Sequence, residues 1–124
     1  MNFWKIEYCA TCNQGKSVEE TLDELTDEQF KSVAKEIKLL EACGNTLRLP
    51  HSKSLGKDLF ELRERRFGYR IYYAFFNNKI IILLHAGAKS SQRNDIKIAR
   101  SRLEKIGKTY ENKELSKLFR EKIG

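Results

Sequence analysis

The feature that most constrains the fold is an uninterrupted aliphatic run, Ile-Ile-Ile-Leu-Leu at 80–84. A strand that is apolar at every position has to be buried on both faces. The preceding segment, residues 69–76, is aromatic and β-branched, and Asn77-Asn78 between the two segments is a tight-turn pair. The sequence therefore predicts an antiparallel hairpin in which residues 79–85 form a central strand.

The surrounding segments complete a sheet and a helical hairpin. Residues 59–63 are expected to join the antiparallel strands through a turn at Phe67-Gly68, and residues 3–8 are expected to form an early strand at an edge. Capping-box patterns at 17–20 and 26–29 open two successive helices, and Gly44 is a natural stop for the second.

Apolar residues continue at helical spacing after the sheet: Ile96, Ala99, Leu103 and Ile106. We expect this helix to end at Gly107 and residues 112–123 to form a short C-terminal helix or a tail that orders on a partner. The predicted fold class is α+β, with an N-terminal strand and a helical hairpin packed on an antiparallel sheet. One domain is expected over residues 1–106, followed by a C-terminal helical extension over 107–124.

Charge is unevenly distributed along the chain, whose net charge is +7. Residues 1–47 carry 5 Lys and Arg against 9 Asp and Glu, whereas residues 48–105 carry 14 against 5. A basic face of this kind favours a polyanionic partner, either nucleic acid or an acidic protein; a solvated surface is the alternative. Without a long apolar run or a secretory signal, we expect a cytoplasmic protein and no membrane partner.

Cys9-Ala-Thr-Cys12 has the C-x-x-C spacing of zinc knuckles and redox sites. A structural zinc ion needs four ligands, and no second C-x-x-C or H-x-x-x-H pair exists in the sequence. We therefore expect neither a metal nor another cofactor, and interpret the motif as a turn at the end of the first strand.

The segment His85-Ala-Gly-Ala-Lys-Ser-Ser-Gln-Arg93 links the central strand to the next helix. It is not a P-loop, because the two required glycines would fall at Leu83 and Ala88. It nevertheless gathers hydrogen-bond donors near a helix N-terminus, which favours an anion. Ser91 or Asn94 acting only as a helix cap is the plainer alternative.

Further cations are expected to converge on this loop. Arg63 and Arg70 lie on strands that we expect to pair, and His51 and Lys53 lie in the loop leading into the sheet. Such a cluster suits a phosphodiester. Two structural alternatives stay open: Arg63 pairs with Glu61, Glu64 or a helix acid, and His85 is satisfied at a strand end.

Three motifs together resemble the RelE/ParE superfamily of type II toxins, close to its HigB-like and phage Gp49-like members. They are Leu59-Phe-Glu-Leu-Arg63, Tyr69-Arg-Ile-Tyr-Tyr73, and Lys89-Ser-Ser-Gln92 with the helix after it. The resemblance covers roughly residues 1–106. The glycine pair and acidic residue common before the loop lysine are here Ala86-Gly87-Ala88.

This resemblance implies a toxin that cleaves mRNA on the ribosome without a metal and is neutralised by a cognate antitoxin of helix-turn-helix type. The alternatives are a non-catalytic toxin that inhibits DNA gyrase or the ribosome, and an inactive relative that only binds an antitoxin. In metal-free cleavage the RNA 2′-hydroxyl attacks the phosphate, which needs a base, an acid and positive charge.

Our hypothesis for the site follows from this chemistry. Arg63 and Arg70 stabilise the phosphate, Lys53 or His51 is the base, and Lys89 or His85 is the acid. Additional RNA-phosphate contacts are expected from Arg65, Arg66, Gln92, Arg93 and Lys97.

Overall fold

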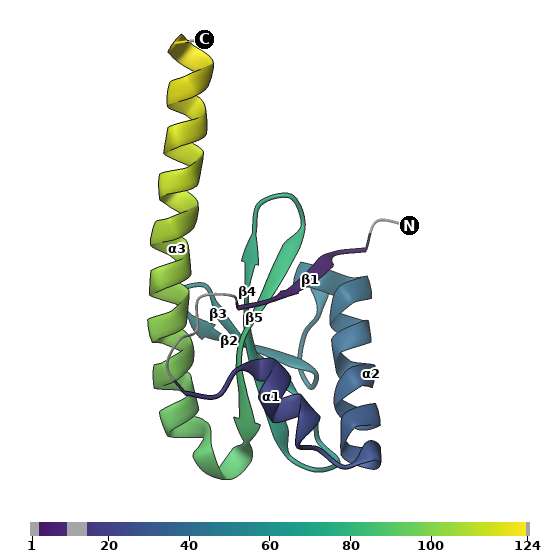
Figure 1. Cartoon of the computed structure of the whole chain (residues 1–124). Helices are drawn as coiled ribbons and strands as arrows, with labels where there is room; N and C mark the ends of the chain where they lie inside the picture. Colours follow the sequence, from purple (N-terminus) through teal and green to yellow (C-terminus); the bar gives the residue numbers. More distant parts are fainter. Residues whose placement is uncertain (1–2, 10–14, 124) are drawn as a thin grey trace.

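The computed structural model describes residues 3–9 and 15–123, with side chains as far as residue 107. A five-stranded sheet in the order β1-β5-β4-β3-β2 forms the middle layer. Helices α1 and α2 cover one face and α3 covers the other (Figure 1). The predicted α+β class is confirmed.

The central hairpin has the predicted form, with β4 at Tyr69–Phe76 and β5 at Ile80–Ala88. β5 lies between β1 (Lys5–Tyr8) and β4, and its residues 81–86 are buried. The strand β3 (Leu59–Arg63) pairs antiparallel with β4, as expected. The aromatic and β-branched segment, the Asn-Asn turn and the aliphatic run were thus sufficient to place the centre of the sheet.

Two features of the sheet differ from the prediction. The segment expected to be a loop forms an edge strand, β2 (Ser52–Gly56), which pairs antiparallel with β3. Its sequence is poor in β-branched residues, so the composition does not indicate a strand. The tight turn at Lys57-Asp58 has positive φ at two non-glycine residues, so the residues at those two positions do not indicate a hairpin turn. The strand β1 is at an edge but runs parallel to β5, because the connection between them is long enough to cross over.

The helical hairpin forms as predicted, with α1 at Val18–Asp23 and α2 at Asp27–Cys43. Both halves of the capping box form at Thr26, and the Ser17 hydroxyl accepts from the Glu20 N–H. α2 ends at Gly44, where φ is +52° and a Cβ would overlap the Trp4 ring. Only glycine permits both that backbone conformation and that close approach.

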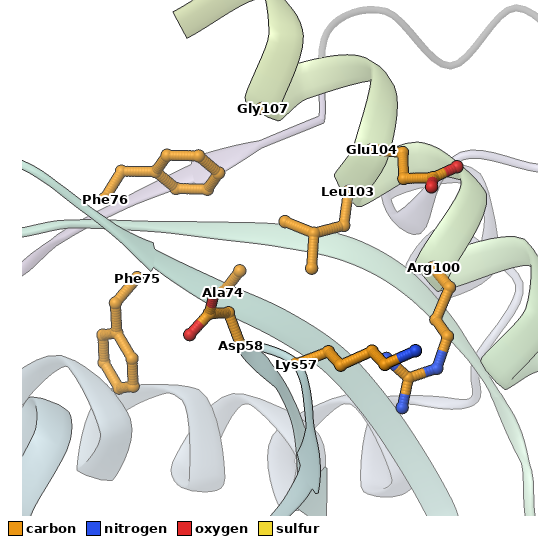
Figure 2. A pocket seen from close by; sticks show the side chains of 9 residues that line it. All are labelled: Lys57, Asp58, Ala74, Phe75, Phe76, Arg100, Leu103, Glu104 and Gly107. Carbon is orange, nitrogen blue, oxygen red and sulfur yellow. The ribbon is translucent and has the colours of Figure 1, made fainter. Parts of the chain in front are cut away.

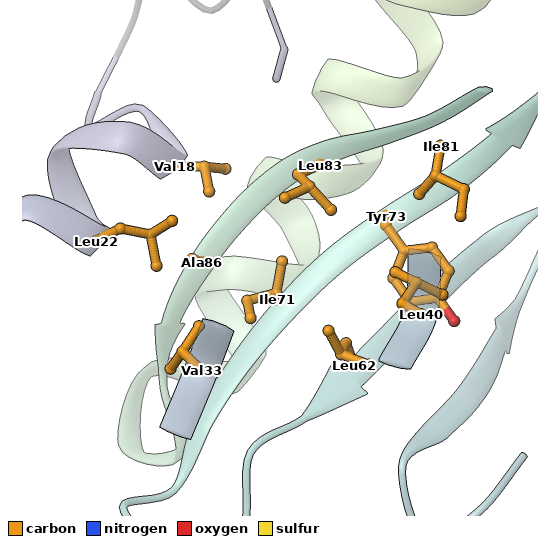
Figure 3. Close-up of a cluster of buried hydrophobic side chains, with 10 residues drawn as sticks. All are labelled: Val18, Leu22, Val33, Leu40, Leu62, Ile71, Tyr73, Ile81, Leu83 and Ala86. Carbon is orange, nitrogen blue, oxygen red and sulfur yellow. The ribbon is translucent and has the colours of Figure 1, made fainter. Parts of the chain in front are cut away.

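Buried apolar side chains of α1 and α2 meet one face of the sheet. Val18 and Leu22 of α1 and Val33 and Leu40 of α2 pack on the central strands (Figure 3). On the opposite face, Ala99 and Ile106 of α3 pack on a second cluster that includes Leu59, Tyr72 and Leu84. Each face of the sheet therefore has its own apolar core.

The predicted helix end at Gly107 is wrong, because α3 runs continuously over Gln92–Ile123. A glycine in a helix interior costs only about 1 kcal/mol relative to alanine, so it weakens a helix without ending it. The later part of α3 extends well past the sheet (Figure 1). In the part of the chain that the structure describes, no helix has the length and apolar character needed to cross a membrane.

Cys9 lies buried directly after β1, and its N–H donates to the Leu83 carbonyl at 3.0 Å. Cys12 lies outside the described residues, so the interpretation of the C-x-x-C motif as a turn stays a prediction.

Candidate functional site

The pairing of the strands places four polar residues in one row across the sheet, and two of them, Lys53 and His85, are predicted site residues. Lys53, Glu61, Tyr72 and His85 are successive Cα partners across β2, β3, β4 and β5. Directly paired residues project on the same face of a sheet, and here it is the face that α3 partly covers. Arg63 and Arg70 are Cα partners in the adjacent row, so both project on that face as well.

Glu61 is the common acceptor in this region, and its residue is 0% exposed. Its Oε1 accepts from Arg63 Nε at 2.8 Å and from Arg70 Nη1 at 2.9 Å, while its Oε2 accepts from Gln92 Nε2 at 2.6 Å. The alternative in which Arg63 pairs with Glu61 is confirmed. β3, β4 and the start of α3 are joined through one carboxylate.

Both arginines keep donors that Glu61 does not use. Arg63 gives only Nε to Glu61, and no described residue accepts from its two terminal nitrogens. The Nε of Arg70 is buried and likewise has no acceptor among the described residues. We call Glu61, Arg63, Arg70 and Gln92 the arginine cluster.

Two lysines border the arginine cluster. Lys53 is exposed on β2, directly opposite Glu61. Lys89 is exposed in the short 3-10 turn after β5, and its N–H donates to the Gly68 carbonyl at 2.8 Å, beside the turn that joins β3 to β4. Two arginines bond Glu61, Lys53 lies opposite it on β2, and Lys89 lies next to the β3–β4 turn, so the region is net positive.

Arg93 and Lys97 are exposed on α3. Arg93 lies four residues before Lys97, and Lys97 lies three residues before Arg100, so the three share one side of the helix. Arg100 donates to the Leu55 carbonyl at 2.7 Å, which places this basic side of α3 toward β2. The predicted phosphate contacts from Arg93 and Lys97 therefore continue the basic region along the helix.

His85 is a satisfied, buried histidine. Its Nδ1 lies 3.0 Å from Arg102 Nη1 and its Nε2 lies 2.8 Å from Asp95 Oδ1. A guanidinium has only donors, so Nδ1 accepts and Nε2–H donates to Asp95, which describes a neutral ring. Burial lowers the pKa of Arg102. The structural alternative for His85 is confirmed, and neither ring nitrogen is available to a substrate.

Gly87 is the glycine that remains in Ala86-Gly87-Ala88, and close packing requires it. A Cβ at this position would overlap the Asp95 carboxylate, which also accepts from Ser91 Oγ at 2.5 Å. Glycine at 87 therefore lets α3 approach β5 closely enough for Asp95 to reach His85. Ser91 belongs to this buried network, and its hydroxyl bonds Asp95 and the Ala88 carbonyl.

The side chains of three predicted residues lie on the α2 side of the sheet. The Nδ1 of His51 lies 3.0 Å from Glu36 Oε2 of α2, and Arg66 lies 3.6 Å from Glu28 of the same helix. Arg65 and Arg66 line an open pocket of about 580 Å³ with polar residues of α2. His51 does lie beside Arg63, whose N–H donates to the His51 carbonyl at 2.8 Å, but the imidazole is directed to Glu36. The structure therefore does not bring the side chains of His51, Arg65 and Arg66 together with those of Arg63 and Arg70.

A second groove, of about 480 Å³, lies between α3, the end of β4 and the β2–β3 turn. Figure 2 shows Leu103 projecting from α3 toward the sheet and Lys57 extending toward Arg100. Its charged residues are mixed: Lys57 and Arg100 face Asp58 and Glu104. None of the predicted catalytic residues lines this groove.

Sequence reasoning named Glu61 only as one possible partner of Arg63, not as a member of the site, and it missed Tyr72. The Tyr72 hydroxyl is buried without a partner among the described residues, and burial together with nearby Glu61 and Asp95 raises its pKa. A signal was present for Glu61, since its carboxylate lies between the apolar residues Phe60 and Leu62. A buried charge in a strand needs a partner, and Arg63 was within reach.

Comparisons with known proteins agree with this architecture. The family described as "Phage derived protein Gp49-like (DUF891)" matches residues 20–111. The free E. coli toxin RelE, as a double arginine-to-alanine mutant, superposes with a TM-score of 0.60 at 14% identity, covering 82% of this chain and 98% of that one. No curated protein sequence matches the chain.

Two further structures have the same fold. The isolated E. coli RelE toxin gives a TM-score of 0.51 at 15% identity over 68% of this chain and 83% of that one. RelE in the archaeal RelE–RelB complex from Pyrococcus horikoshii gives 0.51 at 18% identity over 71% and 97%. At these identities the likeness shows the fold alone.

Proposed function

Since the chain belongs to the phage-derived Gp49-like family and has a RelE-like fold, we propose that it is the toxin of a type II toxin–antitoxin module. Its proposed activity is metal-free endonucleolytic cleavage of mRNA on the ribosome, which stops translation. The observation that carries the proposal is the arginine cluster: two guanidiniums, preset by a buried carboxylate, with donors left unpaired and two exposed lysines beside them.

The arrangement suits the charge changes of this reaction. When the RNA 2′-hydroxyl attacks, the phosphate passes through a pentacoordinate state with additional negative charge. Guanidiniums stay protonated and bind phosphate oxygens with two donors at once, so Arg63 and Arg70 stabilise that state. The substrate's own hydroxyl supplies the nucleophile, and proton transfers are what remains for the protein.

Proton transfer falls to the two lysines in this proposal. His85 is buried with both ring nitrogens bonded, and His51 bonds Glu36 on the other side of the sheet. Of the base and acid candidates named from the sequence, only Lys53 and Lys89 border the arginine cluster. We assign Lys53 to the 2′-hydroxyl and Lys89 to the departing 5′-oxygen.

The basic face that carries the arginine cluster also supports a second candidate function, inhibition by contact without catalysis. Among the described residues, no histidine on this face is free to exchange a proton with a substrate. A toxin that acts by contact alone, on the ribosome or DNA gyrase, needs the basic face but no acid or base.

The two functions are separated by expressing the wild-type protein and mapping mRNA 5′ ends by primer extension. The informative variant is Lys53→Ala/Lys89→Ala, because both side chains are exposed and Glu61 keeps its partners. Its matched control is Lys31→Ala/Lys35→Ala, which removes two exposed lysines from α2. Loss of general acid–base catalysis lowers a rate by about 10²–10⁴-fold, so new 5′ ends should disappear only in the first variant.

Growth arrest without new 5′ ends would overturn the ribonuclease proposal in favour of a contact inhibitor. Cleavage at the wild-type rate by Lys53→Ala/Lys89→Ala would instead remove the two lysines from the mechanism. Because the archaeal RelE was solved with RelB, we also propose a protein antitoxin for this chain. A short helix-turn-helix reading frame beside its gene, whose co-expression restores growth, is the expected finding.

A further inference from the structure

Arg63 and Arg70 face each other across β3 and β4 as direct Cα partners. Two like charges opposite each other in an antiparallel pair repel, which destabilises the pairing. Here the same oxygen, Glu61 Oε1, accepts from both guanidiniums at 2.8 and 2.9 Å. The carboxylate therefore lets two cations remain side by side before any substrate arrives.

Glu61 also reaches a third element, since its other oxygen accepts from Gln92 at the start of α3. Its side chain is 0% exposed, so it cannot itself touch a substrate phosphate. Arg63 and Arg70 are 27% and 12% exposed and stand between Glu61 and the surface. This geometry separates two roles: the arginines meet the phosphate, and Glu61 acts through them.

We propose that Glu61 is a positioning residue, whose carboxylate holds Arg63 and Arg70 as one phosphate-binding unit and ties that unit to α3 through Gln92. The proposal rests on the proposed ribonuclease function. Two guanidiniums and one carboxylate carry a single net positive charge, which matches the single negative charge of a phosphodiester. A preset unit of this kind requires no reorganisation when the transition state forms.

The substitution Glu61→Gln separates positioning from simple electrostatics, because the two predict opposite signs. It adds one positive charge to the site, so electrostatics alone predicts tighter RNA binding and undiminished cleavage. A positioning role predicts a fall in kcat with little loss of RNA affinity, since the guanidiniums are no longer held in register. Small displacements of positioning groups cost about 100-fold in rate.

The experiment measures kcat and KM for ribosome-bound mRNA with the wild type and three variants. Glu61→Gln is expected to lower kcat about 100-fold. Glu104→Gln makes the same charge change on an exposed residue of α3, and Glu64→Gln removes another buried carboxylate that bonds no arginine side chain. Both controls should turn over like the wild type. Wild-type kcat in Glu61→Gln, or an equal loss in either control, overturns the proposal.

A readout that needs no activity keeps the two proposals distinguishable. In ¹⁵N NMR spectra of the free protein, the Nε–H signals of Arg63 and Arg70 should be resolved in the wild type and in Glu104→Gln. In Glu61→Gln, the Arg63 Nε–H should shift toward the solvent-exposed position and broaden. If the wild type cuts no RNA, the ribonuclease proposal fails, and this spectrum alone decides the positioning role. An unchanged Arg63 signal in Glu61→Gln overturns it.

Discussion

Glu61 and Glu64 are both buried near the end of β3 but are stabilised by different partners. Arginine side chains and Gln92 surround Glu61, whereas Glu64 accepts from the N–H groups of Arg66, Phe67 and Tyr69 and from Ser32 of α2. Glu64 therefore shapes the β3–β4 turn and links it to α2. Of the two carboxylates, Glu61 therefore belongs to the candidate site and Glu64 stabilises the fold.

The pH dependence of stability should reveal the role of Glu64. Burial alone would raise its pKa, but hydrogen bonds from the turn and from Ser32 outweigh burial and lower the pKa below its ordinary value of 4.5. A lowered folded-state pKa means that ionised Glu64 stabilises the fold above that value and that this contribution is lost as the pH falls through the folded pKa.

We therefore predict that Glu64→Gln lowers the free energy of unfolding by about 1–3 kcal/mol at pH 7 and loses less stability on acidification than the wild type does. Urea unfolding followed by circular dichroism between pH 3 and 7 measures both quantities. Parallel pH profiles for the two proteins would contradict the assignment.

At the scale of elements, α3 is held by its first half. Arg100 bonds the β2 carbonyls of Leu55 and Gly56, and Arg102 bonds Leu84, His85 and Lys16. Ala99 and Ile106 supply its buried apolar contacts. All of these residues precede Gly107, and the helix then continues past the edge of the sheet (Figure 1).

Truncation after residue 109 is therefore expected to leave the fold intact. The free energy of unfolding should change by about 1 kcal/mol or less, because every described α3 side chain that packs on the sheet is retained. Chemical denaturation with a single cooperative transition would support this outcome. A truncated protein that no longer unfolds cooperatively would place residues 110–124 within the domain and contradict a domain that ends at 106.

How far the sequence predicted each element depended on whether its signal was local. The hairpin β4–β5 and both helix caps follow from neighbouring residues, and all were confirmed. β2 forms because β3 offers it a partner, and the direction of β1 is set by a distant strand. Gly107 is a local signal for the end of a helix, but α3 continues through it.

The candidate site shows the same division. Strand pairing brought Arg63 and Arg70 to one face, as expected, and Lys53 joins them because its segment forms the strand β2 and not the predicted loop. Arg65 and Arg66 lie in a turn, where alternation no longer applies, and the turn directs them toward α2. For His85, the sequence left open whether it was satisfied, because its partners Asp95 and Arg102 come from a helix packed across the sheet.

For the whole molecule, the charge asymmetry seen in the sequence becomes a difference between layers. The acidic residues 1–47 include α1 and α2, while the strongly basic residues 48–105 supply the other four strands and the packed half of α3. An RNA strand should therefore approach the α3 side of the sheet.

Salt dependence of RNA binding tests this polarity. For single strands, each phosphate contact adds about 0.7 to the slope of log K against log salt concentration. Lys53→Ala/Lys89→Ala should reduce that slope by about 1.4, while Lys31→Ala/Lys35→Ala should leave it unchanged. Fluorescence anisotropy with a short labelled RNA between 50 and 200 mM salt provides the measurement. Equal reductions in both variants would argue against a preferred face.

The parallel pairing of β1 with β5 has a consequence for the order of synthesis. Lys5 pairs with Ile80, and the Arg102 guanidinium binds the Lys16 carbonyl. The N-terminal residues are synthesised first, but they cannot make these contacts until the later part of the domain has been synthesised. A nascent chain that lacks α3 also lacks Gln92 beside Glu61. The arginine cluster is therefore complete only after the start of α3 has been synthesised.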